Sequence, residues 1–164
     1  MVNKLSRYVN KTDIEYNFER KDLLYLREKS LKEIIELIFQ TYIDSYSDPH
    51  EVLKKNSFGR AHHRLLCIIE GNPSISIADI LRKLKITKQS LSRVLQDLIK
   101  KNIISQKKGT KDGRQRELVL TEKGIKLCDE IFNKQKKRII NALKNSSSDE
   151  VSNFKSIMKK IIHG

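Results

Sequence analysis

Apolar side chains recur at intervals of three and four residues along most of the chain, the spacing of one face of an α-helix. This pattern, with its polar and Pro/Gly breaks, predicts helices over residues 23–46, 59–70, 77–84, 86–102 and 121–145, and a last helix after Ser147. Residues 1–22 are polar and weakly periodic, and we interpret them as a mobile or loosely docked segment. Val52 and Leu53 lie between two helices and are expected in a loop or short turn.

The first predicted helix has an unusually wide apolar stripe, running from Leu31 to Ile43. A stripe of that width predicts burial on more than one side of the helix. After the helix over 86–102, the pattern changes to two short strand-like runs, residues 103–107 and 117–120, separated by Gly- and Asp-containing sequence. We therefore predict a small β-hairpin, or wing.

The helix over residues 86–102 has marked ends and two different faces. Thr87 is suited to cap its N-terminus, and Asn102 can adopt the left-handed conformation that stops a helix. Apolar residues at helical spacing form one face, and Asp97 is the single acidic residue of the other. The polar face and the first turn carry Thr87, Lys88, Gln89, Ser90, Ser92, Arg93 and Gln96.

A short helix over 77–84 precedes this helix, with a three-residue turn between them, which is the arrangement of a helix-turn-helix. In DNA-binding proteins of this kind the second helix lies in the major groove. Arg can donate two hydrogen bonds to guanine, and Gln can pair with adenine. A solvated polar helix face is the alternative interpretation.

The predicted wing concentrates positive charge near its tip, at Lys108, Lys111, Arg114 and Arg116. Directly after a helix-turn-helix, a basic hairpin fits phosphate contact and insertion of Arg into the minor groove. A solvated basic loop is the alternative.

The chain of 164 residues carries a formal net charge of +14, which favours a polyanionic partner such as double-stranded DNA. No apolar run approaches the length of a membrane span, so we expect a soluble cytoplasmic protein. The sequence has no Gly-rich phosphate loop, no HExxH and no recognisable nucleophile motif, so we predict no enzyme activity and no cofactor.

Cys67 and Cys128 lie far apart within apolar helical patterns, and we predict that both are small core residues, with a redox trigger as the alternative. Arg60, His62 and His63 form a polar cluster at the start of a helix. Adjacent histidines point to different faces of a helix, which disfavours a metal chelate. The cluster fits an effector or interdomain contact, or ordinary helix-start histidines.

The order of elements and two segments resemble the MarR family of bacterial transcription regulators. Residues 87–95, TKQSLSRVL, resemble the family's recognition helix, and residues 112–124, DGRQRELVLTEKG, resemble its wing and the start of the next helix. The resemblance implies that Arg114 enters the minor groove and Asp112 supports the wing. It also implies a dimer formed by the terminal helices, and an effector pocket near the Arg60 cluster. Asn102 stands where the family usually has Gly.

We therefore predict a mainly α fold with a small β wing: a winged helix-turn-helix flanked by N- and C-terminal dimerisation helices. The expected parts are residues 1–22, an N-terminal helix and loop over 23–58, the DNA-binding domain over 59–121, and C-terminal helices over 122–164. The terminal stripes are more extensive than a domain of roughly sixty residues can cover, which independently favours a homodimer. The predicted function is a sequence-specific DNA-binding transcription regulator, a repressor that acts as a homodimer on a pseudo-palindromic operator and is released by a small aromatic effector. The alternative is a winged-helix protein-interaction module or a non-specific nucleic-acid-binding module.

Overall fold

The computed structural model describes residues 23–109 and 116–163, and these divide into two compact units with a boundary after Ile43. The first unit holds the short 3-10 helix η2 (Leu24–Leu26) and most of helix α2 (Glu28–Ser47). No residue of α2 is buried, although its stripe predicted burial on more than one side. A wide stripe predicts that some surface covers the helix, but not which surface.

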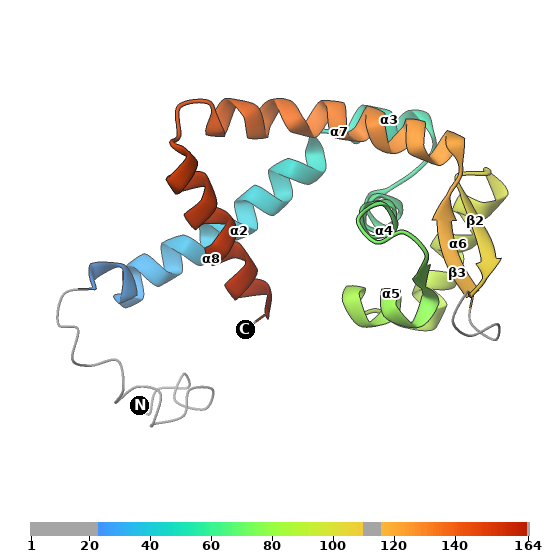
Figure 1. Ribbon diagram of the computed structural model, residues 1–164, viewed down its shortest axis with the longest axis horizontal. Coiled ribbons are helices and arrows are strands. Elements are labelled where there is room, and N and C mark those ends of the chain that lie inside the picture. The colour runs from blue at the N-terminus through green and yellow to red at the C-terminus, as the bar shows by residue number, and fades with distance from the viewer. Residues whose placement is uncertain (1–22, 110–115, 164) are drawn as a thin grey trace, which may run out of the picture. The chain divides into compact units, whose positions relative to one another are not determined.

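The second unit begins with the last turn of α2 and contains all other elements (Figure 1). In chain order these are α3 (His50–Lys55), α4 (Arg60–Glu70), β1 (Ile75–Ser76), α5 (Ile77–Leu84), α6 (Lys88–Lys100), β2 (Ile104–Lys108), β3 (Arg116–Leu120), α7 (Glu122–Leu143) and α8 (Ser148–His163). The predicted loop at Val52 and Leu53 is instead helix α3, and both side chains are buried in the core. The apolar pattern did not predict this helix, because six residues are too few to show a helical period.

Side-chain caps and left-handed residues define the helix ends. The Ser76 hydroxyl accepts a hydrogen bond from the Asp79 N–H at 3.1 Å and starts α5, as the Ser-x-x-Asp pattern predicts. Lys85 and Asn102, with φ of 52° and 56°, adopt the left-handed conformation after α5 and α6. The prediction for Asn102 is therefore confirmed.

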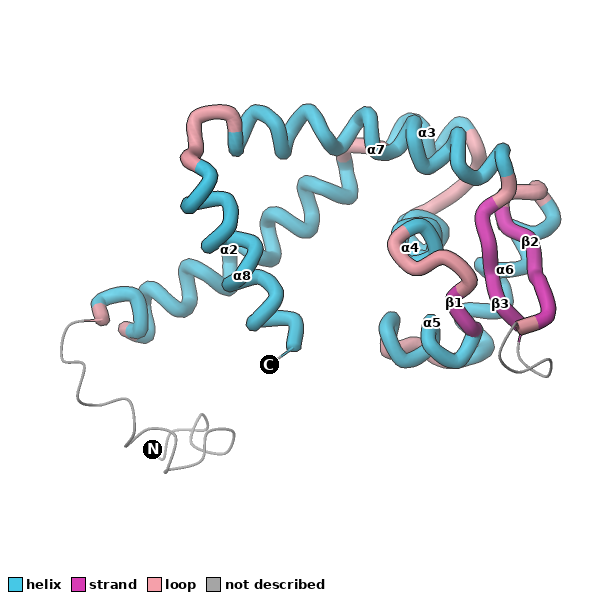
Figure 2. The backbone as a smooth tube through the Cα atoms, viewed as in Figure 1, coloured by secondary structure: helices cyan, strands magenta, loops and turns pink. Residues whose placement is uncertain are grey.

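The three strands form one antiparallel sheet in the order β1-β3-β2 (Figure 2). Ile75 of β1 pairs with Leu118, and Lys108 of β2 pairs with Arg116. This register brings Leu118 onto the core, while the hairpin extends beyond the short β1 as the predicted wing.

The core of the second unit lies between the sheet and helices α3 to α7. Its most enclosed side chains are Leu65, Leu66, Ile69, Ile80, Leu91, Leu98, Ile103, Ile104 and Leu118. Burial of each Leu or Ile contributes about 1.5–3 kcal/mol, so this cluster dominates the stability of the unit. The first half of α7 joins it through Leu127 and Ile131.

The last turn of α2 is tied to α7 by polar contacts. Gln135 donates from Nε2 to the Ser45 carbonyl at 2.9 Å, and Arg138 forms two hydrogen bonds of 2.8 and 2.7 Å with the Asp48 carboxylate. The guanidinium of Arg138 lowers the pKa of Asp48. Within residues 23–109 and 116–163, no helix is both long and apolar enough to cross a membrane.

Candidate nucleic-acid interface

Helix α6 has an inner face that is locked into the core. Leu91, Leu95 and Leu98 are buried, at the spacing that the apolar stripe predicted. At its N-terminus the Thr87 hydroxyl accepts a hydrogen bond from the Ser90 N–H at 3.2 Å, which confirms the predicted cap. The orientation of α6 therefore follows from residues that do not face solvent.

The outer face of α6 is exposed over its whole length. The exposed polar residues there are Lys88, Gln89, Ser92, Arg93 and Gln96, the same set that the sequence places on this face. The hydroxyls of Thr87 and Ser90 are also exposed, but they hydrogen-bond to each other at 2.9 Å. These two hydroxyls thus take part in the cap and shape the first turn.

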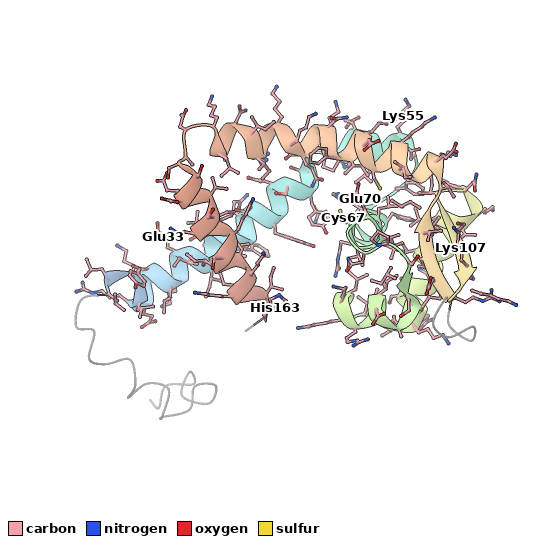
Figure 3. All side chains as sticks on the ribbon, viewed as in Figure 1. Glu33, Lys55, Cys67, Glu70, Lys107 and His163 are labelled. Carbon is pink, nitrogen blue, oxygen red and sulfur yellow. The ribbon has the colours of Figure 1, made fainter. Side chains whose placement is uncertain are left out.

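The wing follows α6 in the sequence and carries further cations. Lys108 ends β2 and Arg116 starts β3, and both side chains are exposed at paired positions of the hairpin. Figure 3 shows Lys107, also exposed, on the same hairpin. The predicted tip residues Lys111, Asp112 and Arg114 lie outside the residues that the structure describes.

Helix α4 supports both helices of the helix-turn-helix through polar side chains. Arg64 donates from its guanidinium to the Leu84 carbonyl at the end of α5, at 3.4 Å. His62 contacts Asp97 of α6, with Nε2 and Oδ2 3.3 Å apart. The sequence analysis assigned no role to Asp97. A single acidic residue on a helix face rich in cations and amides was nevertheless a sign that Asp97 pairs with another residue of the protein.

The three predicted effector residues do not meet at one site. Arg60 is exposed in the first turn of α4, His62 stacks on Phe58, and His63 points into the protein. His63 packs edge-on against Tyr46, with ring centroids 4.9 Å apart. The expectation that adjacent histidines point to different faces is met.

His63 lines a small cavity of about 50 Å³ between α4 and α7. The other lining residues are Leu66, Cys67, Glu70, Cys128, Ile131, Phe132 and Gln135. The His63 side chain is only 1% exposed, and neither ring nitrogen makes a hydrogen bond of normal geometry within the described part of the chain. Burial lowers the pKa of His63, and the nearby Gln135 amide offsets this only in part, so the ring is neutral at pH 7.

The two cysteines differ in burial. Cys128 is buried as predicted, but Cys67 is exposed, so the prediction that Cys67 is a core residue is wrong. Figure 3 shows Cys67 and Glu70 on α4. Burial first and the Glu70 charge second raise the pKa of Cys128 to about 12. The same two causes raise the pKa of Cys67, because its thiol lines the cavity between α4 and α7 although the residue as a whole is exposed. Both thiols are protonated at pH 7 and are therefore weak nucleophiles.

No group of three or more His, Cys, Asp or Glu side chains suited to a metal ion occurs in the described residues. The arrangement that remains is a capped helix with an exposed hydrogen-bonding face, followed by a basic hairpin. Such a surface is suited to base edges and phosphates rather than to bond-making chemistry.

Comparison with known proteins agrees with this geometry. The sequence model of the MarR family matches residues 57–115. The chain is 34% identical over 140 residues to the HTH-type transcriptional regulator PetP of Rhodobacter capsulatus, covering 85% of this chain and 84% of the relative.

Solved structures share the fold. A MarR transcriptional regulator from Methanosarcina mazei superposes with a TM-score of 0.64 at 20% identity, over 79% of this chain and 95% of that one. A mutant MarR from E. coli complexed with operator DNA gives a TM-score of 0.58 at 21% identity, over 85% and 98% of the two chains. With a mainly helical fold, a three-stranded sheet and these relatives, the chain belongs to the MarR family of winged-helix transcription regulators, which are not enzymes.

Proposed function

We propose that this regulator binds an operator as a homodimer, with α6 of each chain in the major groove and the β2–β3 hairpin against the adjoining backbone and minor groove. The observation that carries the proposal is the exposed polar face of α6, opposite a leucine face that is fully packed. A helix held in this way presents its polar side chains at fixed spacing, which base recognition requires.

The proposed base readers are Gln89, Arg93 and Gln96, with Lys88 and Ser92 beside them. Arg93 can donate two hydrogen bonds to guanine, and either Gln can pair with adenine. Each good bidentate contact discriminates by about 1–3 kcal/mol against a wrong base. The positive end of the α6 dipole, at the first turn near Thr87 and Ser90, favours a phosphate.

The proposed backbone contacts come from the wing. Lys108 and Arg116 flank its tip and are exposed, so each can neutralise a phosphate. Lys111 and Arg114 are proposed to contact DNA from the tip, with Arg114 in the minor groove and Asp112 supporting the loop, as the family resemblance implies.

The proposed dimer covers apolar faces that a single chain leaves exposed. On α8, Phe154, Ile157 and Ile161 are each at least half exposed and share one face of the helix. Contiguous exposed apolar surface of this kind marks a protein interface. A two-fold dimer would read a pseudo-palindrome with half-sites about 34 Å apart, one helical turn of DNA.

The proposed regulation is release from the operator when a small aromatic effector binds. A groove of about 420 Å³ beside the His63 cavity shares Phe132 and Gln135 with it and is large enough for one aromatic ring. Ile139 and Ile140 make it apolar, and Lys136 supplies a cation. We infer repression because an operator-bound dimer blocks polymerase, and we place the protein in the cytoplasm, where bacterial operators lie.

The test is selection of bound sequences from a random double-stranded DNA pool with the purified protein at near-physiological salt. Enrichment of an inverted repeat with one-turn half-site spacing is the expected result. Binding of all sequences alike would favour a non-specific nucleic-acid-binding role. Absence of any DNA binding, with or without washing out bound small molecules, would favour a protein-interaction module.

The salt dependence of binding adds a second measure. A DNA reader loses roughly 0.9 log units of affinity per log unit of salt for each phosphate neutralised, yet keeps its sequence preference. A protein-interaction module would show neither property.

A further inference from the structure

His62 connects the start of α4 to the recognition helix α6 through both of its ring nitrogens. The Gly59 N–H donates to Nδ1 at 3.1 Å, so Nδ1 is an acceptor and the neutral ring carries its proton on Nε2. That proton points to Oδ2 of Asp97 on α6, 3.3 Å from Nε2. One imidazole therefore caps one helix and holds another.

Aromatic packing fixes the plane of this ring. Phe58, which is buried, stacks on His62 with ring centroids 4.8 Å apart and planes 28° apart. The Lys101 ammonium lies 4.6 Å from the centroid of the Phe58 ring and donates to the Asn56 carbonyl. We name the set Gly59, His62 and Asp97, with Phe58 and Lys101 behind it, the His62 clamp.

The leucine face of α6 decides which side of the helix faces outward, and the clamp can set the rotation of the helix more finely. Apolar packing is non-directional, so it holds the helix against the core but resists small rotations about the helix axis only through the steric fit of the side chains. A rotation of about 20° moves a side-chain atom 5–6 Å from the axis by about 2 Å. A shift of that size breaks a hydrogen bond to a base.

Asp97 follows Arg93 by one helical turn, on the same side of α6. We propose that His62 is a positioning residue, which sets the rotation of α6 through Asp97 and thereby sharpens discrimination between operator and random DNA. This inference rests on the proposed function, because it concerns base reading by α6. His62 itself need not touch DNA.

The chemistry favours His over other residues at this position. The ring of His allows an acceptor at one edge and a donor at the other at the same time. Asn matches only the inner half of this ring: its oxygen can accept from the Gly59 N–H where Nδ1 does, but its side chain is too short to donate to Asp97. His62→Asn should therefore keep the cap and lose the link to Asp97.

The test compares Asp97→Asn with Asp97→Ala. The two variants have the same net charge, so electrostatic attraction to phosphate changes equally in both. Asn keeps an oxygen that can accept from His62 Nε2–H, and Ala has none. Ala is also the better helix former, so weaker DNA reading by Asp97→Ala cannot be attributed to melting of α6.

The measurement is the ratio of dissociation constants for random and operator duplexes at one salt concentration, with the operator taken from the selection experiment. We expect Asp97→Asn to keep the wild-type ratio and Asp97→Ala to lower the ratio about two- to fivefold. This magnitude is the lower part of the range for one hydrogen bond, because Asp97 is exposed. In a His62→Asn background the difference between Asn and Ala at position 97 should disappear. Asp129→Ala, which removes an exposed acid from α7, is the matched charge control and should leave the ratio unchanged.

Two results would overturn the inference while the proposed function stands, both with wild-type protein that discriminates. In the first, Asn and Ala at position 97 behave alike; in the second, their difference persists with His62→Asn. Wild-type protein that does not discriminate would overturn the proposed function and this inference together. The ¹⁵N chemical shifts of the His62 ring give a readout without DNA. They should report a proton on Nε2 in wild-type protein, and the alternative tautomer would also overturn the clamp.

Discussion

Gly124, in the first turn of α7, lies against the backbone at the start of β2 so closely that no side chain fits. A Cβ added there would lie 2.1 Å from the Ile103 carbonyl oxygen, whereas real Cβ contacts essentially never fall below 3.0 Å. The obstacle is backbone rather than a flexible side chain, so Gly124→Ala must move α7 away from Ile103 by about 1 Å.

The hydrogen bonds at this junction give the magnitude. Thr121 donates from its backbone N–H to the Ile103 carbonyl at 3.0 Å, and its hydroxyl donates to the Asn102 carbonyl at 2.7 Å. Weakening both bonds costs about 1 kcal/mol in all, and the overpacking itself costs about 1–3 kcal/mol. We expect Gly124→Ala to lower the free energy of unfolding by about 2–4 kcal/mol, a large part of the 5–15 kcal/mol typical of a folded protein.

The assay is urea unfolding followed by circular dichroism at one fixed protein concentration, since association shifts apparent stability. A slope of about 2 kcal/mol per molar urea converts the expected loss into a midpoint lower by about 1–2 M. Gly71→Ala is the matched control: its Cβ would meet the Cys67 carbonyl oxygen at an ordinary 3.4 Å, and its φ of −74° suits Ala. That control should gain about 0.4–1 kcal/mol. A Gly124→Ala midpoint within error of wild type would refute the close approach.

Other predictions concern the interface, the dimer and the buried histidine. Arg93→Ala should weaken operator binding by about 1–3 kcal/mol and weaken random-DNA binding less; equal losses on the two DNAs would show that Arg93 does not read bases. Lys108→Ala should weaken binding to operator and random DNA alike, and should reduce the slope of log affinity against log salt by about one. Ile157→Lys, on the exposed face of α8, should shift the protein from dimer to monomer in sedimentation, and an unchanged mass would exclude that face from the interface. Because burial lowers the pKa of His63 below 6.5, the unfolded chain takes up a proton before the folded chain does, and stability is lost as pH falls below that value. His63→Phe keeps a ring against Tyr46, so this variant should lose less free energy of unfolding than wild type when the pH is lowered from about 7.5 to about 5.5, as measured by urea unfolding. Equal losses in the two proteins would show that His63 is not the group responsible for the pH dependence.

Local chemistry made much of the fold and interface predictable. Thr87 and Ser76 cap helices because a hydroxyl accepts a backbone N–H three residues later, and that geometry needs no distant partner. The polar face of α6 follows from helical spacing alone, since the 3.6-residue period decides which side chains share a face. The family resemblance extended this reading to the wing and its flanking residues.

Burial, by contrast, depends on surfaces that meet only in the folded chain. Cys67 and Cys128 stand in similar apolar patterns, yet only Cys128 is buried, because the register of α4 against α7 decides which thiol is enclosed. His62 and His63 are adjacent, and only the packing of α4 places one beside Asp97 and the other at the small cavity between α4 and α7.

The amino-acid pattern was enough to locate most helix ends and the polar side of α6, because these depend on interactions within a few residues. Only the tertiary structure decided which apolar stripes the chain can bury, and that Asp97, 35 positions from His62, lies beside it. The physical reason is that hydrophobic burial and long-range hydrogen bonds require surfaces from distant segments, and their relative placement is not encoded in any local period.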